Sequence, residues 1–212
     1  MNKVRNIFKT LDYNIIRKYH KYWGRLTVKD NADYFRRWLF AFCSVHTTWE
    51  SNVSGYNAIK DFTRWLGDDE ALLRYLKTGR CGLYNNRTTY ISAFASDFWG
   101  DPATYKRREA EPWFVFRDRL ASRIKGLGPA KTSFALEMSF PLEAEVVCLD
   151  VHMLRLYGDE DAGRKQTYYK YEADWLGRSV KAETPPYIAR LAYWDKLQGQ
   201  KDSRYWSACL ET

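Results

Sequence analysis

The chain has 212 residues, of which 45% are hydrophobic and 28% charged, and its formal net charge is +8. This length and hydrophobic content exclude a chain too short to bury a core, and they suit one domain or two small lobes. The basic balance favours a polyanionic partner, although charge alone is weak evidence without a phosphate-binding motif.

Helical periodicity dominates the chain in order. Helices are predicted over residues 3–22, 30–42, 55–66, 70–77, 85–99, 112–122, 129–139, 150–157 and 188–197, with Asp30 or Asn31 capping the second. The stretch 44–54 is predicted to be a loop or a broken helix start, 103–111 a solvated charged segment and 159–183 an irregular polar segment. The one β-like run is 145–149.

The predicted fold is therefore all-α, a single domain over residues 1–212 built from two lobes. Lobe A comprises about residues 30–140, and lobe B comprises the N-terminal helix with about residues 141–212. Trp206 is expected to pack the C-terminal segment back on the body. We expect a monomer.

The four cysteines, at positions 43, 81, 148 and 209, lie far apart and form no CxxC pair. This spacing disfavours a zinc or iron–sulfur site, so no metal and no cofactor are predicted. Reduced thiols favour a cytoplasmic protein. Residues 1–25 are interrupted by charge every few positions, so neither a signal peptide nor a membrane span is expected.

A tight turn at residues 125–128 joins two predicted helices, and Pro129 follows it directly. Its glycines allow a backbone that other residues avoid and let a phosphate approach, while Leu127 can plug between the helices. The free N–H groups of the next helix and its dipole favour an anion. The expected phosphate-binding residues are Lys125, Gly126, Leu127, Gly128 and Lys131. The alternative is an ordinary corner between two helices.

A lone acid, Asp150, closes the β-like run and opens a helix. Its structural role would be to cap that helix. Its functional role would be to activate a nucleophile or to stabilise positive charge developing on a sugar or base. His152 follows two residues later and either makes a structural hydrogen bond or joins Asp150 in a proton relay.

Four segments in this order resemble the helix-hairpin-helix DNA glycosylase superfamily, the group of endonuclease III and 8-oxoguanine glycosylase. They are FAFCSVHTTWESNVSGYNAIKDF, LKTGRCGLYNNRTTYISAF, IKGLGPAKTSFALEM and VVCLDVHMLRLYG. The resemblance implies a two-lobe fold with the active-site cleft between the lobes, binding of double-stranded DNA and extrusion of a base. It also implies that Asp150 matches the catalytic aspartate of the superfamily and that His46 falls near the position of the wedge residue.

The chain departs from the bifunctional members of that superfamily, which carry a lysine two residues after the second hairpin glycine. Here that position is Ala130. Lys131 lies one step further, about 100° around the helix. The missing nucleophile argues against strand cleavage through a Schiff base. The iron–sulfur cysteines of the endonuclease III group are absent as well.

The strings GLGPAK and CLDVH resemble more closely a branch found in phages, some members of which modify bases instead of excising them. These members replace the pyrophosphate of an activated 5-hydroxymethyluracil in DNA with an amine. The resemblance implies an amino acid or polyamine as co-substrate and a location in the host cytoplasm. Asp150 would deprotonate the amine or stabilise the transition state. Candidates for binding the leaving pyrophosphate are Lys125, Lys131, Arg87 and Arg155.

Three functions follow from these observations. The main hypothesis is a phage-type base-hypermodification transferase, which explains the missing lyase lysine. The alternative is a base-excision glycosylase without lyase activity, in which Asp150 activates water. A non-catalytic DNA-binding module is disfavoured because Asp150 stands where the superfamily has its catalytic acid.

Overall fold

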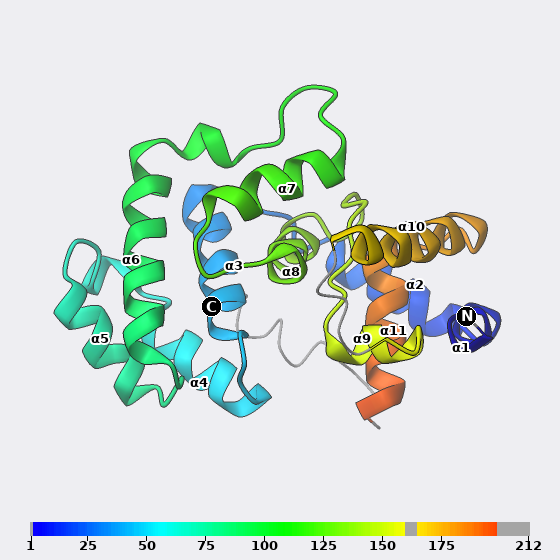
Figure 1. The fold of residues 1–212 in the computed structure, drawn as a ribbon, viewed down its shortest axis with the longest axis horizontal. Helices are drawn as coiled ribbons and strands as arrows, with labels where there is room; N and C mark the ends of the chain where they lie inside the picture. The colour runs from blue at the N-terminus through cyan, green and yellow to red at the C-terminus, as the bar shows by residue number, and fades with distance from the viewer. Residues whose placement is uncertain (1, 160–164, 199–212) are drawn as a thin grey trace. The chain divides into compact units, whose positions relative to one another are not determined.

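The computed structural model describes residues 2–159 and 165–198, and within these ranges it is helical and contains no β-strand (Figure 1). The all-α prediction is confirmed. The chain forms two compact units. The hairpin unit comprises residues 28–135, and the acid unit comprises residues 2–27, 136–159 and 165–198. Trp206 and Cys209, about which the sequence made predictions, lie outside the described residues.

The acid unit contains α1 (Asn2–Lys9), α2 (Tyr13–Trp23), α9 (Val151–Leu156), α10 (Lys165–Lys181) and α11 (Pro186–Gln198). The hairpin unit contains α3 (Asn31–Cys43), α4 (Trp49–Ile59), α5 (Asp69–Thr78), α6 (Tyr84–Gly100) and α7 (Trp113–Arg123). Short 3₁₀ turns at Phe62–Arg64 and Pro102–Tyr105 follow α4 and α6. The border between the units falls within α8 (Pro129–Ser139). No helix in these ranges is both long and apolar enough to cross a membrane.

Polar caps set where several helices begin, because a side-chain oxygen accepts from an N–H that the first turn leaves unpaired. The capping residues are Asp12, Asp30, Thr48, Asp68 and Asp150. The Asp30 cap expected from the sequence is confirmed. The single helix predicted over 3–22 is wrong, because Asp12 accepts from Asn14 N–H at 2.8 Å and starts a second helix there. A cap at Thr48 likewise starts α4 inside the predicted loop.

The core of the hairpin unit is aromatic and centres on α3. Phe35 is fully buried, and its ring stacks on Phe94 of α6 with centroids 5.3 Å apart. It also meets Phe62 at 5.1 Å and Phe98 at 5.2 Å. Helix α3 packs against α4 and α6, and α5 packs against both of them (Figure 1). These rings therefore serve packing, as large aromatic side chains usually do.

The acid unit is held by contacts between the N-terminal helices and α10 and α11. Trp23 of α2 meets Tyr187 of α11 with ring centroids 5.1 Å apart, and both side chains are fully buried. Phe8 of α1 meets Trp175 of α10 at 4.8 Å. Segments from both ends of the sequence thus share one core.

Two sequence predictions fail in the acid unit. Residues 165–181 form α10, where an irregular segment was expected, because the buried stripe of this helix includes the polar residues Glu172 and Ser179 beside Trp175. Apolar periodicity alone does not reveal such a stripe. The β-like run 145–149 forms no strand and lies outside regular secondary structure.

Candidate functional site

The predicted phosphate-binding turn lies between α7 and α8 in the hairpin unit. Gly126 has φ +87°, in the left-handed region that favours glycine, and a Cβ at this position would lie 2.4 Å from the Tyr90 ring of α6. Leu127 is buried, whereas Lys125 and Gly128 are exposed. A Cβ at Gly128 would meet nothing within 4 Å. Gly126 is therefore required by the turn itself, and Gly128 faces open space.

The N-terminus of α8 presents backbone donors at this turn. The hydrogen bond from Thr132 N–H to the Gly128 carbonyl, 3.0 Å long, closes the first turn of the helix. The N–H groups of Ala130 and Lys131 precede this bond and have no carbonyl one turn earlier in the helix, and Pro129 has no N–H. The half-buried Lys131 holds its amino group 5.6 Å from the centroid of the Phe134 ring. This arrangement suits an anion at the helix terminus.

His46, which is predicted to bind DNA near the position of the wedge residue, lies in the turn between α3 and α4. Its side chain is exposed, and its φ of +47° lies in the left-handed region. Few residues other than glycine adopt this conformation without support from their surroundings.

Arg87 provides that support, and its burial argues against the predicted role in binding DNA or pyrophosphate. Its side chain is 4% exposed. Its Nε–H donates to the Phe42 carbonyl at 3.2 Å, and the rest of the guanidinium donates to the carbonyls of Cys43, Val45, Cys81 and Gly82. A guanidinium has five N–H donors. Because backbone carbonyls on both sides of the His46 turn and the α6 start occupy them, Arg87 is structural.

Asp150 lies in the acid unit and caps α9. Its Oδ1 accepts from the N–H groups of His152 and Met153, both at 3.0 Å, and the side chain is half-buried. Capping thus occupies one carboxylate oxygen and fixes the orientation of the group. A held, partly accessible carboxylate is suited to acid–base or electrostatic catalysis.

His152 is joined to Asp150 through its backbone N–H. Its imidazole packs edge-to-face on Trp194 of α11, with ring centroids 4.9 Å apart and planes at 85°. The proton relay expected from the sequence stays a prediction. Arg155 is exposed in the last turn of α9.

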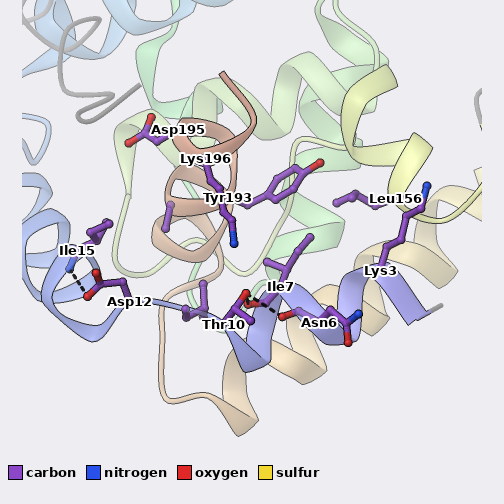
Figure 2. Close-up of a pocket in the computed structure, with 12 residues that line it drawn as sticks. Lys3, Asn6, Ile7, Thr10, Asp12, Ile15, Leu156, Tyr193, Asp195 and Lys196 are labelled. Atoms are coloured by element: carbon purple, nitrogen blue, oxygen red, sulfur yellow. Dashed lines mark hydrogen bonds between the residues drawn. The ribbon is translucent and has the colours of Figure 1, made fainter. Parts of the chain in front are cut away.

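Tyr193 of α11 is a neighbour of Asp150. Burial, followed by the negative charge of Asp150, raises the pKa of its phenol. Tyr193 also lines a cavity of about 860 Å³ in the acid unit (Figure 2). The wall is mostly apolar, with two lysines and two aspartates among its residues, namely Lys3, Lys196, Asp12 and Asp195. Nothing in the local sequence distinguishes Tyr193 from a packing aromatic.

The structure therefore groups the predicted residues in two sets. The hairpin unit holds Lys125, Gly126, Leu127, Gly128, Lys131, His46 and Arg87, and the acid unit holds Asp150 and His152. Among the described residues, no group of three or more His, Cys, Asp or Glu could hold a metal ion.

No family model matches this sequence, and no curated protein matches it significantly. Solved structures do. The 8-oxoguanine DNA glycosylase of Methanocaldococcus jannaschii superposes with a TM-score of 0.72 at 21% identity, over 93% of this chain and 94% of that chain. The chain has the fold of that glycosylase. The 8-oxoguanine glycosylase/lyase of the same organism, in complex with 15-mer DNA containing 8-oxoguanine, gives 0.72 at 22% identity over 94% and 97%.

Alanine substitutions at the two hairpin glycines are expected to lower the free energy of unfolding by different amounts. Gly126→Ala combines a positive φ with a clash against Tyr90 and should lower the free energy of unfolding by about 1–3 kcal/mol. Gly128→Ala places its methyl group in open space and should cost less than about 1 kcal/mol. Urea denaturation of both variants measures this difference, and equal losses would contradict the assignment.

Arg87→Met should lower the free energy of unfolding by at least about 3 kcal/mol, because several hydrogen bonds from one charged donor are lost together. Arg74→Met, on the exposed face of α5, is the matched control and should stay within about 0.5 kcal/mol of the wild type. Chemical denaturation provides the comparison. A stable Arg87→Met protein would show that the five carbonyls do not need this side chain.

Proposed function

We propose that this protein is a DNA glycosylase without lyase activity, which extrudes a base from duplex DNA and hydrolyses its N-glycosidic bond. The observation that carries the proposal is the half-buried N-terminus of α8 behind the exposed glycines of the 125–128 turn, on a fold shared with an 8-oxoguanine DNA glycosylase. The rest of the proposal assigns chemistry to Asp150.

The turn and α8 would bind a backbone phosphate of the DNA. The N–H groups of Ala130 and Lys131 and the positive end of the helix dipole attract the phosphate oxygens. The open space at Gly128 lets the phosphate approach the backbone, and exposed Lys125 adds charge. Such contacts position the duplex but carry no sequence information.

Asp150 would act on the sugar of the extruded nucleotide. As the bond between C1′ and the base nitrogen breaks, positive charge develops on the sugar and the electron pair leaves with the base. A carboxylate nearby stabilises that charge and accepts a proton from the water that attacks C1′. The departing base takes up that proton, so the products are the free base and an abasic site in an intact strand.

The absence of lyase chemistry is proposed from Ala130, which has no amine to attack C1′. Lys131 does not replace it in this proposal, because its amino group lies over the Phe134 ring of its own helix. His46 would fill the gap left by the extruded base, since it is exposed in a turn that Arg87 holds. Because one of the compared structures contains 8-oxoguanine in its DNA, a duplex with that base is the first substrate to test.

The second candidate is the base-hypermodification transferase, which the GLGPAK and CLDVH strings favour. Here an amine would attack the methylene of a pyrophosphorylated 5-hydroxymethyluracil. The new C–N bond would replace the C–O bond to pyrophosphate, Asp150 would take the amine proton, and the glycosidic bond would stay intact. An amino acid or a polyamine would supply the amine.

Product analysis separates the two candidates. The protein is incubated with duplex DNA that contains 8-oxoguanine, and separately with duplex DNA that contains pyrophosphorylated 5-hydroxymethyluracil plus glycine or putrescine. Mass spectrometry of the products should find free base and uncleaved abasic strands. An amine-substituted thymidine with its sugar intact would refute the glycosylase and support the transferase.

Asp150→Asn should abolish most of the activity without unfolding the protein. Asparagine caps helices about as well as aspartate, so the melting temperature should change little. Loss of an acid–base group is expected to lower kcat by about 10²–10⁴-fold. Single-turnover kinetics with the 8-oxoguanine duplex measure the effect, and full activity in this variant would remove Asp150 from the mechanism.

Lys125→Ala should weaken binding to every DNA sequence alike and reduce the slope of log K against log salt by about 1. Lys29→Ala, an exposed lysine of the same unit outside the turn, is the control and should leave the slope unchanged. Fluorescence anisotropy over a salt series provides both slopes. An unchanged slope for Lys125→Ala would contradict the phosphate assignment.

A further inference from the structure

The backbone directly before Asp150 has an unusual set of partners. Residues 147–149 are buried and lie outside regular secondary structure, so no neighbouring strand takes up their N–H groups. Buried backbone N–H groups nevertheless need acceptors. In this segment the acceptors are side chains, which come from two helices of the same unit.

Two side chains of helix α10 accept hydrogen bonds along one edge of the segment. Glu172 Oε1 accepts from Val147 N–H at 2.9 Å, and the Tyr168 hydroxyl accepts from Leu149 N–H at 3.4 Å. The same hydroxyl donates to the Val147 carbonyl at 2.5 Å. Tyr168 and Glu172 are four residues apart and thus share one face of α10. Val147 and Leu149 are two residues apart, as N–H groups on one edge of an extended chain must be.

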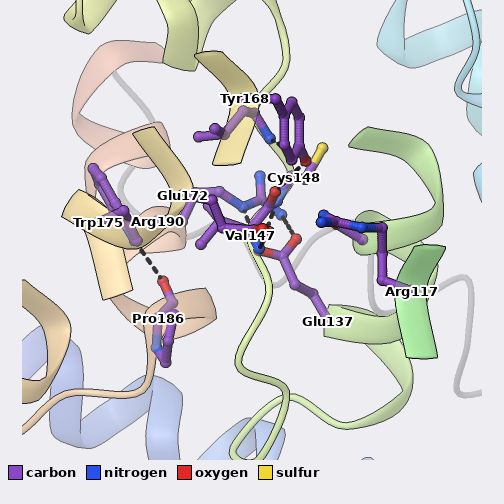
Figure 3. Close-up of polar contacts among 11 residues, drawn as sticks. Arg117, Glu137, Val147, Cys148, Tyr168, Glu172, Trp175, Pro186 and Arg190 are labelled. Carbon is purple, nitrogen blue, oxygen red and sulfur yellow. Dashed lines mark hydrogen bonds and ion pairs between the residues drawn. The ribbon is translucent and has the colours of Figure 1, made fainter. Parts of the chain in front are cut away.

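A side chain of helix α8 accepts a hydrogen bond on the opposite edge. Glu137 Oε1 accepts from Cys148 N–H at 3.2 Å. Arg190 of α11 holds this carboxylate with two hydrogen bonds, of 3.0 and 2.6 Å. Figure 3 shows these side chains converging on Val147 and Cys148. The segment is therefore held from both edges, as a central strand would be, but by three side chains.

We propose that Glu137, Tyr168 and Glu172 are positioning residues for Asp150, which fix the chain that leads into its carboxylate. This inference rests on the role of Asp150 in the proposed function. The hydrogen bonds described for these three side chains reach the backbone of residues 147–149 and Arg190. They act through the backbone of residues 147–149, and the held chain delivers the Asp150 carboxylate to the start of α9.

Burial of charge at this place favours a positioning role over a stabilising one. Glu137 is fully buried and Glu172 is 3% exposed, with Arg190 5% exposed beside them. Burial raises the pKa of the Glu137 carboxyl, and the charge of Arg190 opposes that shift. A buried ion pair adds little net stability compared with apolar packing, so we attribute to the Glu137–Arg190 pair the geometry that it imposes on the chain.

The test uses Tyr168→Phe, which removes one hydroxyl and keeps the ring. Tyr171→Phe is the matched control, because it removes a hydroxyl from the same helix whose partner is Asp159 at 3.1 Å. Amide hydrogen exchange by NMR is followed at Leu149 and at His152, whose N–H is capped by Asp150. In Tyr168→Phe, exchange should become about fivefold faster at both amides, since a hydrogen bond is lost and the cap loosens. The control should change neither.

Kinetics provide the functional arm. The activities of Tyr168→Phe, Glu172→Gln and Glu172→Ala are measured well below their melting temperatures. Tyr168→Phe should lower kcat by about 10–100-fold with an unchanged Kd for DNA, since misplacement of a catalytic group acts on the transition state. Glu172→Gln keeps an acceptor for Val147 N–H and should retain more activity than Glu172→Ala.

Unchanged exchange at His152 in Tyr168→Phe would overturn the proposal, even if Leu149 exchanged faster. The hydrogen bonds that hold residues 147–149 would then have no effect on the Asp150 cap. Faster exchange at both amides with an unchanged kcat would also overturn it. A wild-type protein that neither excises nor modifies bases would refute the proposed function instead. In that case the exchange at His152 still decides whether Glu137, Tyr168 and Glu172 position Asp150.

Discussion

The structure depends on satisfying buried backbone groups where no regular element can do so. In the hairpin unit, one buried cation, Arg87, gathers carbonyls from both sides of the turn that carries His46. In the acid unit, buried carboxylates and a phenol gather the N–H groups that precede Asp150. Each irregular segment thus has a defined path because a side chain replaces the missing backbone partner. Both segments lead directly to a residue that the proposed function requires.

Part of this arrangement could be predicted from the sequence. The turn at 125–128, helix α8 and the caps at Asp30 and Asp150 follow from local rules, because glycine, proline and aspartate act on their immediate neighbours. The partners of Arg87 lie up to 45 residues away in the chain, and no local pattern marks them. Helix α10 escaped prediction because its buried face uses Glu172 to hold backbone, where the pattern of an amphipathic helix requires an apolar residue.

The proposed site likewise has one part that local sequence patterns reveal and one part that depends on residues distant in the sequence. The turn that is proposed to bind phosphate is a local structure, so its glycines are recognisable in the sequence even though their roles differ. Gly126 makes the turn against Tyr90, and Gly128 leaves open space. A catalytic carboxylate needs a fixed path through the fold, and the residues that set that path come from α8, α10 and α11. In the proposed function, Ala130 limits the chemistry because it offers no amine to the sugar of the extruded nucleotide.

The proposed function requires that the α8 terminus binds a DNA phosphate and that Asp150 acts on the sugar of an extruded nucleotide. A crystal structure of the Asp150→Asn variant with duplex DNA that contains 8-oxoguanine tests it most directly. We expect a backbone phosphate against the N–H groups of Ala130 and Lys131, and a nucleotide turned out of the helix with its C1′ facing the substituted side chain. DNA bound with all its bases stacked, or bound away from the 125–128 turn, would contradict the proposed function.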